Sequence, residues 1–390
     1  MADRFGGKWL FGGCILLSSV ISLLTPSAAR IHIVLFIILR FFSGLGEGVM
    51  LPAVYAMIAR WSVPEYRSLV VNVIFTGSDI GVVGMLLSGV LCDHGFAGGW
   101  PSVFYMFGMF GCVWSVAWFL LCYNSPSTHP RISTVELKYW ETMIGTADLV
   151  AHPPSPWRAI FTSLPVWALA AAFFANNWIF YTLRTCLPLF LHDVFGLDMT
   201  TTGALSAVSF LPAMVATPFA GLLADWLRAP GRLSTNVVRK IFCVPGFILA
   251  GGFLILAGHT SCNPAVAVAC MVAVTGSATI SFTTVAVNHL DLAPLHAGKI
   301  MGLTYTIASL ASIAAPQAAA ALTSHHSTRS DWQQVFLLAA GIGTVSAVIF
   351  LIFGTGKRQQ WADDTSSAQL SVTHQRNNKH ASNDEEIAEQ

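Results

Sequence analysis

The sequence has few charged residues. Lys, Arg, Asp and Glu make up only 10% of its 390 residues, whereas hydrophobic residues make up 54% and the mean hydropathy is +0.64. A soluble domain carries about 25% charged residues. This shortage argues against a soluble globular protein and favours a membrane protein, and we expect no nucleic acid among its partners.

The sequence also lacks recognisable sites for covalent or metal chemistry. Its eight cysteines lie mostly in or beside apolar segments, and no pair has metal-ligand spacing in a polar context. We interpret them as small packing residues rather than as a disulfide framework. There is no nucleophile–base set either. The chain is therefore not expected to be an enzyme, or to hold a metal or another cofactor.

Long apolar segments dominate what is present. A helix needs about 20 apolar residues to cross a bilayer. These segments are continuously apolar rather than alternating, which favours helices over a barrel. We count ten of them, at approximately 9–26, 31–58, 67–91, 101–123, 160–192, 200–226, 238–259, 263–288, 298–323 and 333–355. The sequence thus predicts an all-α membrane protein.

Polar stretches divide this array. Residues 125–157 are polar and rich in proline, which predicts a linker between two helical bundles. The amino-terminal bundle would occupy 1–124 with four helices, and the carboxy-terminal bundle 158–356 with six. Residues 357–390 have almost no large apolar side chains, which predicts a disordered tail.

The basic residues between segments predict the topology, since cytoplasmic loops collect Lys and Arg. Loops on one side hold twelve, namely Arg4, Lys8, Arg60, Arg67, Arg131, Lys138, Arg158, Arg228, Arg232, Arg239, Lys240 and Lys299. Loops on the opposite side hold two, Arg30 and Arg329. We therefore expect both termini, the linker and the tail to be cytoplasmic.

Two charges interrupt the second apolar segment. An intramembrane charge costs at least about 2.5–3.5 kcal/mol, so it usually faces a cavity or a partner. Arg40 and Glu47 are seven residues apart, which places them on one helix face but about 10 Å apart along the axis. We predict an anion site at Arg40, near the midplane, and a protonatable carboxylate at Glu47. The alternative is that each pairs with a neighbouring helix to fix packing.

The fifth apolar segment offers a row of hydrogen-bond donors. Asn177, Tyr181 and Arg184 follow the i, i+4, i+7 rule and share a face. Their amide, hydroxyl and guanidinium groups suit a carboxylate or sugar hydroxyls. We predict that they bind substrate, although Arg184 lies near the outer end, where its head group could instead reach water.

Two further groups are candidates for proton coupling. Asp79 is a lone carboxylate in the third segment, which could join a proton relay or be capped by neighbouring hydroxyls. His289 lies two residues before Asp291 at the inner end of the eighth segment. The pair could titrate together, or the polar cluster could simply organise a loop.

Two short segments about 220 residues apart look like copies of one another. The first contains Asp3, Arg4, Gly7 and Lys8, and the second contains Asp225 and Arg228. Both resemble the loop motif of the major facilitator superfamily, which recurs in the two halves of that fold. The resemblance implies that these six residues form gates.

Three further segments resemble the organic-anion branch of that superfamily, which includes sialin, the vesicular glutamate transporters and the type I phosphate transporters. Arg40–Val49 resembles its fourth helix, Asn177–Leu183 its seventh, and Asn288–Pro294 the end of its tenth. The resemblance implies two helical bundles with a site between them at the midplane. It also implies a cavity role for Arg40 and a proton-linked role for Glu47.

The chain also departs from the family pattern in three respects. The ten segments would correspond to family helices three to twelve, so we expect the first two helices to be missing from the chain as written. Vesicular glutamate transporters look to carry an arginine where this chain has Asn176, which favours a sialin-like member. Sialin itself looks to carry a second acid where this chain has Ser43, which puts the number of coupled protons in doubt.

The predicted function is secondary active transport of organic anions, either sialic acid-like sugar acids or related carboxylates, by alternating access. The expected partners are a small organic anion, a proton or a sodium ion, and the lipid bilayer. Sodium-coupled phosphate transport is an alternative. A second alternative is a truncated, non-transporting partner or regulator of a full-length transporter. The membrane would be lysosomal or vesicular, or the plasma membrane.

Overall fold

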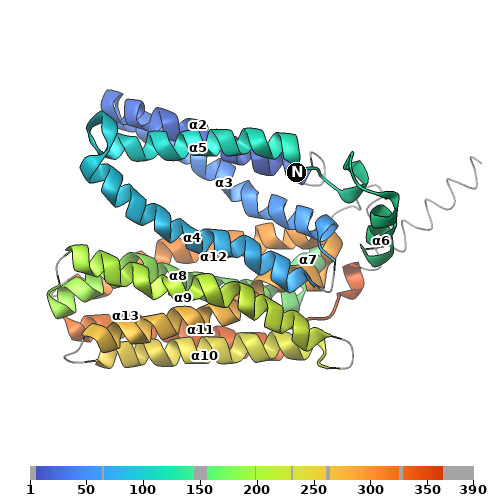
Figure 1. The fold of residues 1–390 in the computed structure, drawn as a ribbon. Helices are drawn as coiled ribbons and strands as arrows, with labels where there is room; N and C mark the ends of the chain where they lie inside the picture. Colours follow the sequence, from blue (N-terminus) through green and yellow to red (C-terminus); the bar gives the residue numbers. More distant parts are fainter. Residues whose placement is uncertain are drawn as a thin grey trace, which may run out of the picture.

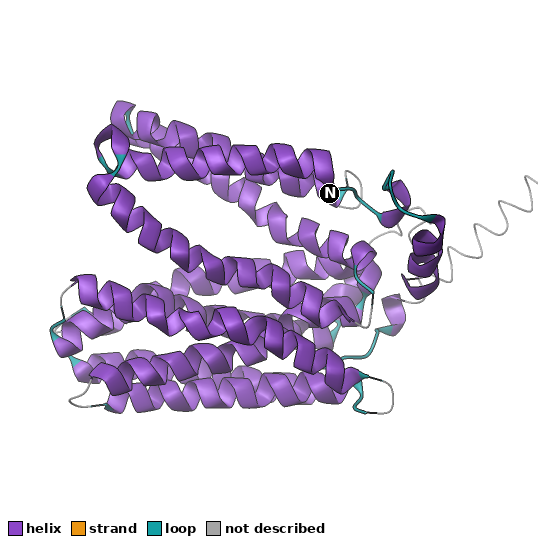
Figure 2. Ribbon diagram, viewed as in Figure 1, coloured by secondary structure: helices purple, strands orange, loops and turns teal. Residues whose placement is uncertain are grey.

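The structure is a computed structural model that describes residues 6–63, 66–144, 156–197, 199–229, 232–260, 264–324 and 328–362. This described part is helical and contains no strand (Figure 2). Ten long helices correspond to the ten predicted segments: α2 (Gly7–Ile31), α3 (Ile33–Trp61), α4 (Arg67–His94), α5 (Trp100–Leu121), α8 (Leu164–Phe195), α9 (Met199–Arg228), α10 (Thr235–His259), α11 (Pro264–Leu292), α12 (Ala297–Thr323) and α13 (Arg329–Phe353). The short helices are η2 (Phe96–Gly98), η3 (Pro126–Thr128), α6 (Thr134–Ile144), α7 (Trp157–Thr162) and η5 (Pro294–His296).

The long helices have the dimensions of membrane spans. Within the described residues, nine are long and apolar enough to cross a bilayer, and α4 is the tenth long helix with 28 residues. Helices satisfy their own backbone hydrogen bonds, which is what the hydrocarbon core demands. The prediction of an all-α membrane protein is confirmed.

Local signals set the helix boundaries. One residue, His32, separates α2 from α3, and its side chain accepts a hydrogen bond from the backbone N–H of Val34. At the start of α10, the hydroxyl of Ser234 accepts from the N–H of Val237 as an N-cap. At the end of α8, Gly196 adopts the left-handed conformation, with φ of 65°, that often ends a helix.

The helices form two groups (Figure 1). Helices α2, α3 and α5 lie together at the top of the view, α8 to α13 pack together at the bottom, and α4 runs diagonally between them. The best-packed core is in the lower group, where Phe173, Phe190, Phe247 and Phe336 are almost fully buried. The upper group is far more open, since α3 leaves large apolar side chains such as Phe41 exposed.

One end of the array carries most of the basic residues. We call it the basic end; it holds the last residue of α3, the first of α4 and the last of α9, and lies at the right of Figure 1. The opposite end, which holds the turn at His32, is called the far end. The division of the chain into two bundles and a linker remains a prediction, because residues 145–155 of the predicted linker lie outside the described residues.

The first residues of the predicted tail differ from the prediction. A disordered segment was expected to start at Lys357, but the structure packs the chain against the helices as far as Ala362, which is only 1% exposed. The reason is that Trp361 and Ala362 are apolar and pack against the hydrophobic core, although the composition of the tail as a whole is polar. Residues 363–390 lie outside the described residues.

Candidate functional site

A carboxylate stands at the middle of α3. Because α3 runs from Ile33 to Trp61, its central residue is Glu47. The Glu47 Oε1 atom accepts a hydrogen bond of 3.0 Å from Ser43 and one of 3.2 Å from Ser18 of α2. The two serine hydroxyls also lie 3.2 Å apart. The carboxylate is therefore oriented by two hydroxyls, and it borders a cavity of about 280 Å³ between α2, α3 and α5.

Arg40 is anchored nearer to the far end. Its Nη2 atom donates a 3.1 Å hydrogen bond to Thr25 of α2, and its guanidinium lies 5.5 Å and 5.1 Å from the ring centroids of Phe36 and Phe104. Arg40 lies seven residues, about 10 Å along the axis, from the central residue of α3. Its predicted position near the midplane of the bilayer remains a prediction.

These contacts make a polar seam between two apolar helices. Thr25 and Ser18 on α2 follow the i, i+7 spacing, and so do Arg40 and Glu47 on α3. Because α2 and α3 run in opposite directions, Thr25 meets Arg40 and Ser18 meets Glu47. Neither charge is paired with the other, as the spacing predicted.

One tyrosine of the other group of helices lies near Glu47, and a second tyrosine lies near the first. Tyr305 of α12 lies close enough to both Glu47 and Tyr181 of α8 to interact electrostatically with them. A carboxylate from α3 and phenols from α8 and α12 thus share one region between the two groups. Sequence analysis identified Tyr181 but missed Tyr305, whose only signal is a polar stretch, Thr304–Thr306, inside an apolar helix.

The rest of the predicted row on α8 has mixed surroundings. Asn177 donates a 2.9 Å hydrogen bond to the carbonyl of Phe173 in its own helix. The guanidinium of Arg184 lies 4.4 Å from the ring centroid of Phe180. Asn176, by contrast, is buried and donates to the carbonyl of Ala278 in α11, so it packs two helices together. Tyr181 of the predicted row lies near Tyr305, which in turn lies near Glu47.

His289 and Asp291 are directed to different partners. His289 is fully buried, its Nε2 atom lies 2.7 Å from the Thr304 hydroxyl, and its ring packs edge-on against Tyr55. Asp291 instead forms a 2.7 Å ion pair with Arg239 of α10. The predicted coupling of the two residues therefore has no direct hydrogen bond in the described part of the chain.

Three other predicted residues lie outside what the structure describes. Asp3 and Arg4 precede the first described residue, and the Asp79 side chain is not described although its backbone belongs to α4. The later part of the first loop motif is described. A Cβ atom at Gly7 would collide with the side chain of Met57 of α3, and the Lys8 N–H donates a 2.9 Å hydrogen bond to Asn124. This segment therefore packs closely against the basic end of the upper group.

The second loop motif joins α9 of the lower group to α4. Asp225, near the end of α9, accepts a 2.8 Å hydrogen bond from the backbone N–H of Leu69 in the first turn of α4. It also forms a 3.3 Å ion pair with Arg228. The helices approach so closely that a Cβ atom at Gly221 would lie 3.1 Å from the Leu69 Cα atom. A carboxylate suits the unpaired N–H groups and the positive end of a helix N-terminus.

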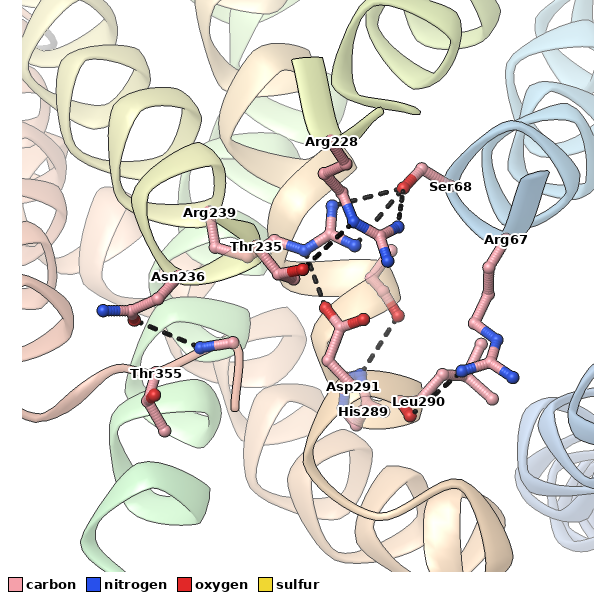
Figure 3. A network of polar contacts seen from close by, with 12 residues as sticks. Arg67, Ser68, Arg228, Thr235, Asn236, Arg239, His289, Leu290, Asp291 and Thr355 are labelled. Carbon is pink, nitrogen blue, oxygen red and sulfur yellow. Dashed lines mark hydrogen bonds and ion pairs between the residues drawn. The ribbon is translucent and has the colours of Figure 1, made fainter. Parts of the chain in front are cut away.

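The hydroxyl of Ser68 lies at the centre of this network (Figure 3). It accepts a hydrogen bond of 3.4 Å from Arg228 and two of 3.3 Å from the fully buried Arg239. Arg67, the preceding residue, reaches the carbonyl of Leu290 in α11 at 3.5 Å. Two adjacent residues of α4 are thus held by α9, α10 and α11.

A further contact near the basic end joins α3 to α11. The Tyr55 hydroxyl of α3 donates a 2.6 Å hydrogen bond to the carbonyl of Ala286 in α11, and both residues are fully buried. Nearby, a Cβ atom at Gly298 would lie 2.8 Å from the carbonyl oxygen of Pro52. The two groups of helices are therefore tied together at the basic end, whereas Glu47 is exposed.

Comparison with known proteins assigns the family. A sequence profile for the Major Facilitator Superfamily matches residues 1–316. The chain belongs to the Major Facilitator Superfamily. Two solved structures support the fold. The proton:xylose symporter XylE has a TM-score of 0.71 and 14% sequence identity, over 94% of this chain and 84% of that one. The human organic anion transporter MFSD10 has a TM-score of 0.66 and 16% sequence identity, over 89% of this chain and 78% of that one.

Curated relatives place the chain within the organic-anion branch of the superfamily. Vesicular glutamate transporter 3 of Danio rerio is 38% identical over 93% of this chain and 62% of its own length, and vesicular glutamate transporter 2 of Homo sapiens is 37% identical over 96% and 65%. The uncharacterized transporter slc-17.2 of Caenorhabditis elegans is 38% identical over 93% and 74%. The chain thus spans less than two thirds of the vesicular glutamate transporters it matches.

These comparisons confirm the predicted superfamily and its organic-anion branch. They do not extend to the finer prediction of a sialin-like member, which remains a prediction. The same holds for the expected loss of two family helices before Asp3.

Proposed function

We propose that this chain provides the substrate pathway of a secondary active organic-anion transporter that works by alternating access. The observation that carries the proposal is the placement of Glu47. It is an exposed carboxylate at the middle of a membrane-spanning helix, and Tyr305 of the other group of helices lies near it. At the basic end, the two groups are joined by the hydrogen bond from Tyr55 to the carbonyl of Ala286. In this proposal the basic end is cytoplasmic and the site opens toward the far end.

Each polar group has a distinct proposed role. Arg40 attracts the anion through its fixed positive charge, held by Thr25 and two aromatic rings. Tyr181 and Tyr305 donate hydrogen bonds to the bound anion. Glu47 binds and releases the coupled proton, with sodium as the alternative ion. The network around Asp225 and Ser68 is the cytoplasmic gate, which must open for release to the cytoplasmic side.

The proposed substrate class is organic carboxylates. Relatives named as glutamate transporters favour an amino-acid carboxylate, whereas Asn176, buried against α11, leaves no added positive charge at that position and favours sugar acids. We propose sialic acid-like sugar acids or related carboxylates, with phosphate as the alternative substrate. The membrane would be vesicular or lysosomal, or the plasma membrane.

A second candidate function is a non-transporting membrane partner of a longer transporter. The observation in its favour is the open face of α3, where Ile33 is 61% and Phe41 63% exposed. Such a face would suit additional helices supplied by another chain.

An uptake screen distinguishes these functions. The protein would be reconstituted in proteoliposomes and offered sialate, glutamate, urate and phosphate under imposed pH and sodium gradients. Accumulation of one carboxylate driven by the pH gradient is the expected result. A protein that inserts normally but accumulates none of these anions under either gradient would contradict transport and favour the partner function.

A further inference from the structure

The chain that follows α13 crosses the basic end instead of leaving it. We call residues Gly354–Ala362 the strap. The N–H of Gly356 donates a 3.2 Å hydrogen bond to the Asn236 side chain at the start of α10, and the N–H of Gln359 donates a 2.9 Å bond to the carbonyl of Leu292, the last residue of α11 (Figure 3 shows the first of these contacts). Because the last carbonyls of a helix lack partners within it, the strap satisfies one that α11 leaves open.

The strap is fixed at both of its ends. Toward α13, a Cβ atom at Gly356 would lie 2.9 Å from the Thr235 side chain, so this glycine permits close passage along α10. At the other end, the Trp361 ring stacks on His296, with centroids 6.2 Å apart and planes 15° apart. Ala362 is 1% exposed. The strap is therefore packed structure and bridges the ends of two helices.

The helix ends that it bridges carry the cytoplasmic gate. Thr235, one residue before Asn236, accepts a 3.4 Å hydrogen bond from Arg228. Asp291, one residue before Leu292, pairs with Arg239, which in turn donates to Ser68 of α4. The gate contacts of α10 and α11 thus lie next to the points where the strap is attached.

We infer that the strap is a positioning element of the gate. By joining the start of α10 to the end of α11, it keeps Arg239 and Asp291 in the arrangement that meets Ser68. The strap makes this contribution through its backbone hydrogen bond to Leu292 and through the Trp361 anchor. Loosening it favours the state in which the cytoplasmic end is open. This inference rests on the gate of the proposed function.

The test measures gate opening without a substrate. Val71 of α4 is fully buried near the gate, and a Val71→Cys variant of the whole chain, with its native cysteines replaced, would be labelled from the cytoplasmic side by a membrane-impermeant maleimide. Gln359→Pro removes the N–H donor, whereas the matched control Gln359→Ala keeps it. Trp361→Ala removes the anchor, and Trp361→Phe restores part of it.

The expected result is faster labelling of Val71→Cys by about two- to tenfold in Gln359→Pro and Trp361→Ala, which is the range for the loss of one hydrogen bond. Gln359→Ala and Trp361→Phe should remain near the parent rate. Unfolding is monitored separately in a protein that retains only the native Cys243, which is fully buried in α10. Labelling of Cys243 should not change in any strap variant.

A positive control distinguishes failure of the proposed gate from failure of the proposed role of the strap. Asp225→Ala removes the contact between α9 and α4, so it should speed the labelling of Val71→Cys. If it does so while Gln359→Pro and Trp361→Ala stay at the parent rate, or speed the labelling of Cys243 equally, the strap has no role in the gate. If Asp225→Ala itself has no effect, the gate is wrong and the inference about the strap fails with it.

Discussion

Asp225 of α9 and the backbone N–H of Leu69 in α4 are joined by a 2.8 Å hydrogen bond. This contact links α9 to α4 through a side chain of α9 and the amino-terminal end of α4. A helix terminus offers unpaired N–H groups and a partial positive charge, so any carboxylate placed there is attracted to it. A gate built in this way depends on position and on charge rather than on the identity of Leu69.

Removal of this carboxylate should weaken the gate strongly. In Asp225→Ala, we expect cytoplasmic labelling of Val71→Cys to rise by about 10- to 100-fold, since hydrogen bonds to charged groups contribute about 1.5–3 kcal/mol. Asp193→Ala is a suitable control, because Asp193 pairs with Trp332 near the far end of α8. A comparable rise in Asp193→Ala would indicate general loosening of the fold.

Arg40 should be required for anion uptake but not for insertion. Its guanidinium lies on the far-end side of Glu47 and contacts Thr25, Phe36 and Phe104. We expect Arg40→Ala to lower uptake of the transported anion by at least about tenfold, since hydrogen bonds to charged groups contribute about 1.5–3 kcal/mol. Arg40→Lys keeps the charge and should retain part of the uptake. Unchanged affinity in Arg40→Ala would assign Arg40 a packing role.

Tyr305 should contribute to affinity through its hydroxyl. Tyr305→Phe removes one donor and keeps the ring, so we expect KM to rise by about 10-fold or more with little change in thermal stability. Tyr66→Phe is a matched control, since Tyr66 is 58% exposed at the start of α4. Equal KM values for Tyr305→Phe and the parent protein would remove Tyr305 from the proposed site.

The helices could be predicted from the sequence because each segment that crosses a bilayer must be long and apolar and must form its backbone hydrogen bonds within itself. It also identified Arg40 and Glu47, since a charge in such a segment is conspicuous. It could not assign Ser18 and Thr25 as their partners. That assignment depends on the register of α2 against α3, which is set by packing along both helices.

Two other features could not be predicted from the sequence, for different reasons. Tyr305 was missed because a single tyrosine in an apolar helix gives no pattern, and its closeness to Glu47 arises only when α12 is placed opposite α3. The strap was missed because the polar composition of 357–390 outweighs Trp361 and Ala362. In both cases the deciding contact joins residues far apart in the chain.

Cys122, just beyond the end of α5, reports on the first loop motif. Burial raises the pKa of its thiol, and the nearby Lys8 ammonium opposes part of that rise. Since the thiolate is the reactive form, Cys122 should be alkylated slowly at neutral pH and faster as the pH rises above the usual thiol range. Lys8→Gln removes the opposing charge, raises the pKa further and should slow alkylation, whereas Lys8→Arg should not. Faster alkylation in Lys8→Gln would contradict this arrangement.

Glu47 gives the most direct test of coupling. Its carboxylate lies at the centre of α3 and is oriented by Ser18 and Ser43, so it is placed to bind a proton in one state of the cycle and release it in another. Glu47→Gln resembles the protonated form and cannot release a proton. We therefore expect substrate exchange at equal concentrations to survive, while accumulation driven by a pH gradient is lost.

Both activities can be measured in the same proteoliposomes. Ser22→Ala, a change in the same cavity that leaves the carboxylate in place, is the matched control and should keep pH-driven accumulation. If Glu47→Gln accumulates substrate as the parent protein does, Glu47 is not the coupling acid. The assignment would then pass to Asp79 or His289. Of these, His289 lies within hydrogen-bond distance of the Thr304 hydroxyl. Thr304 precedes Tyr305 in α12, so a change in this contact would reach the residue next to Tyr305.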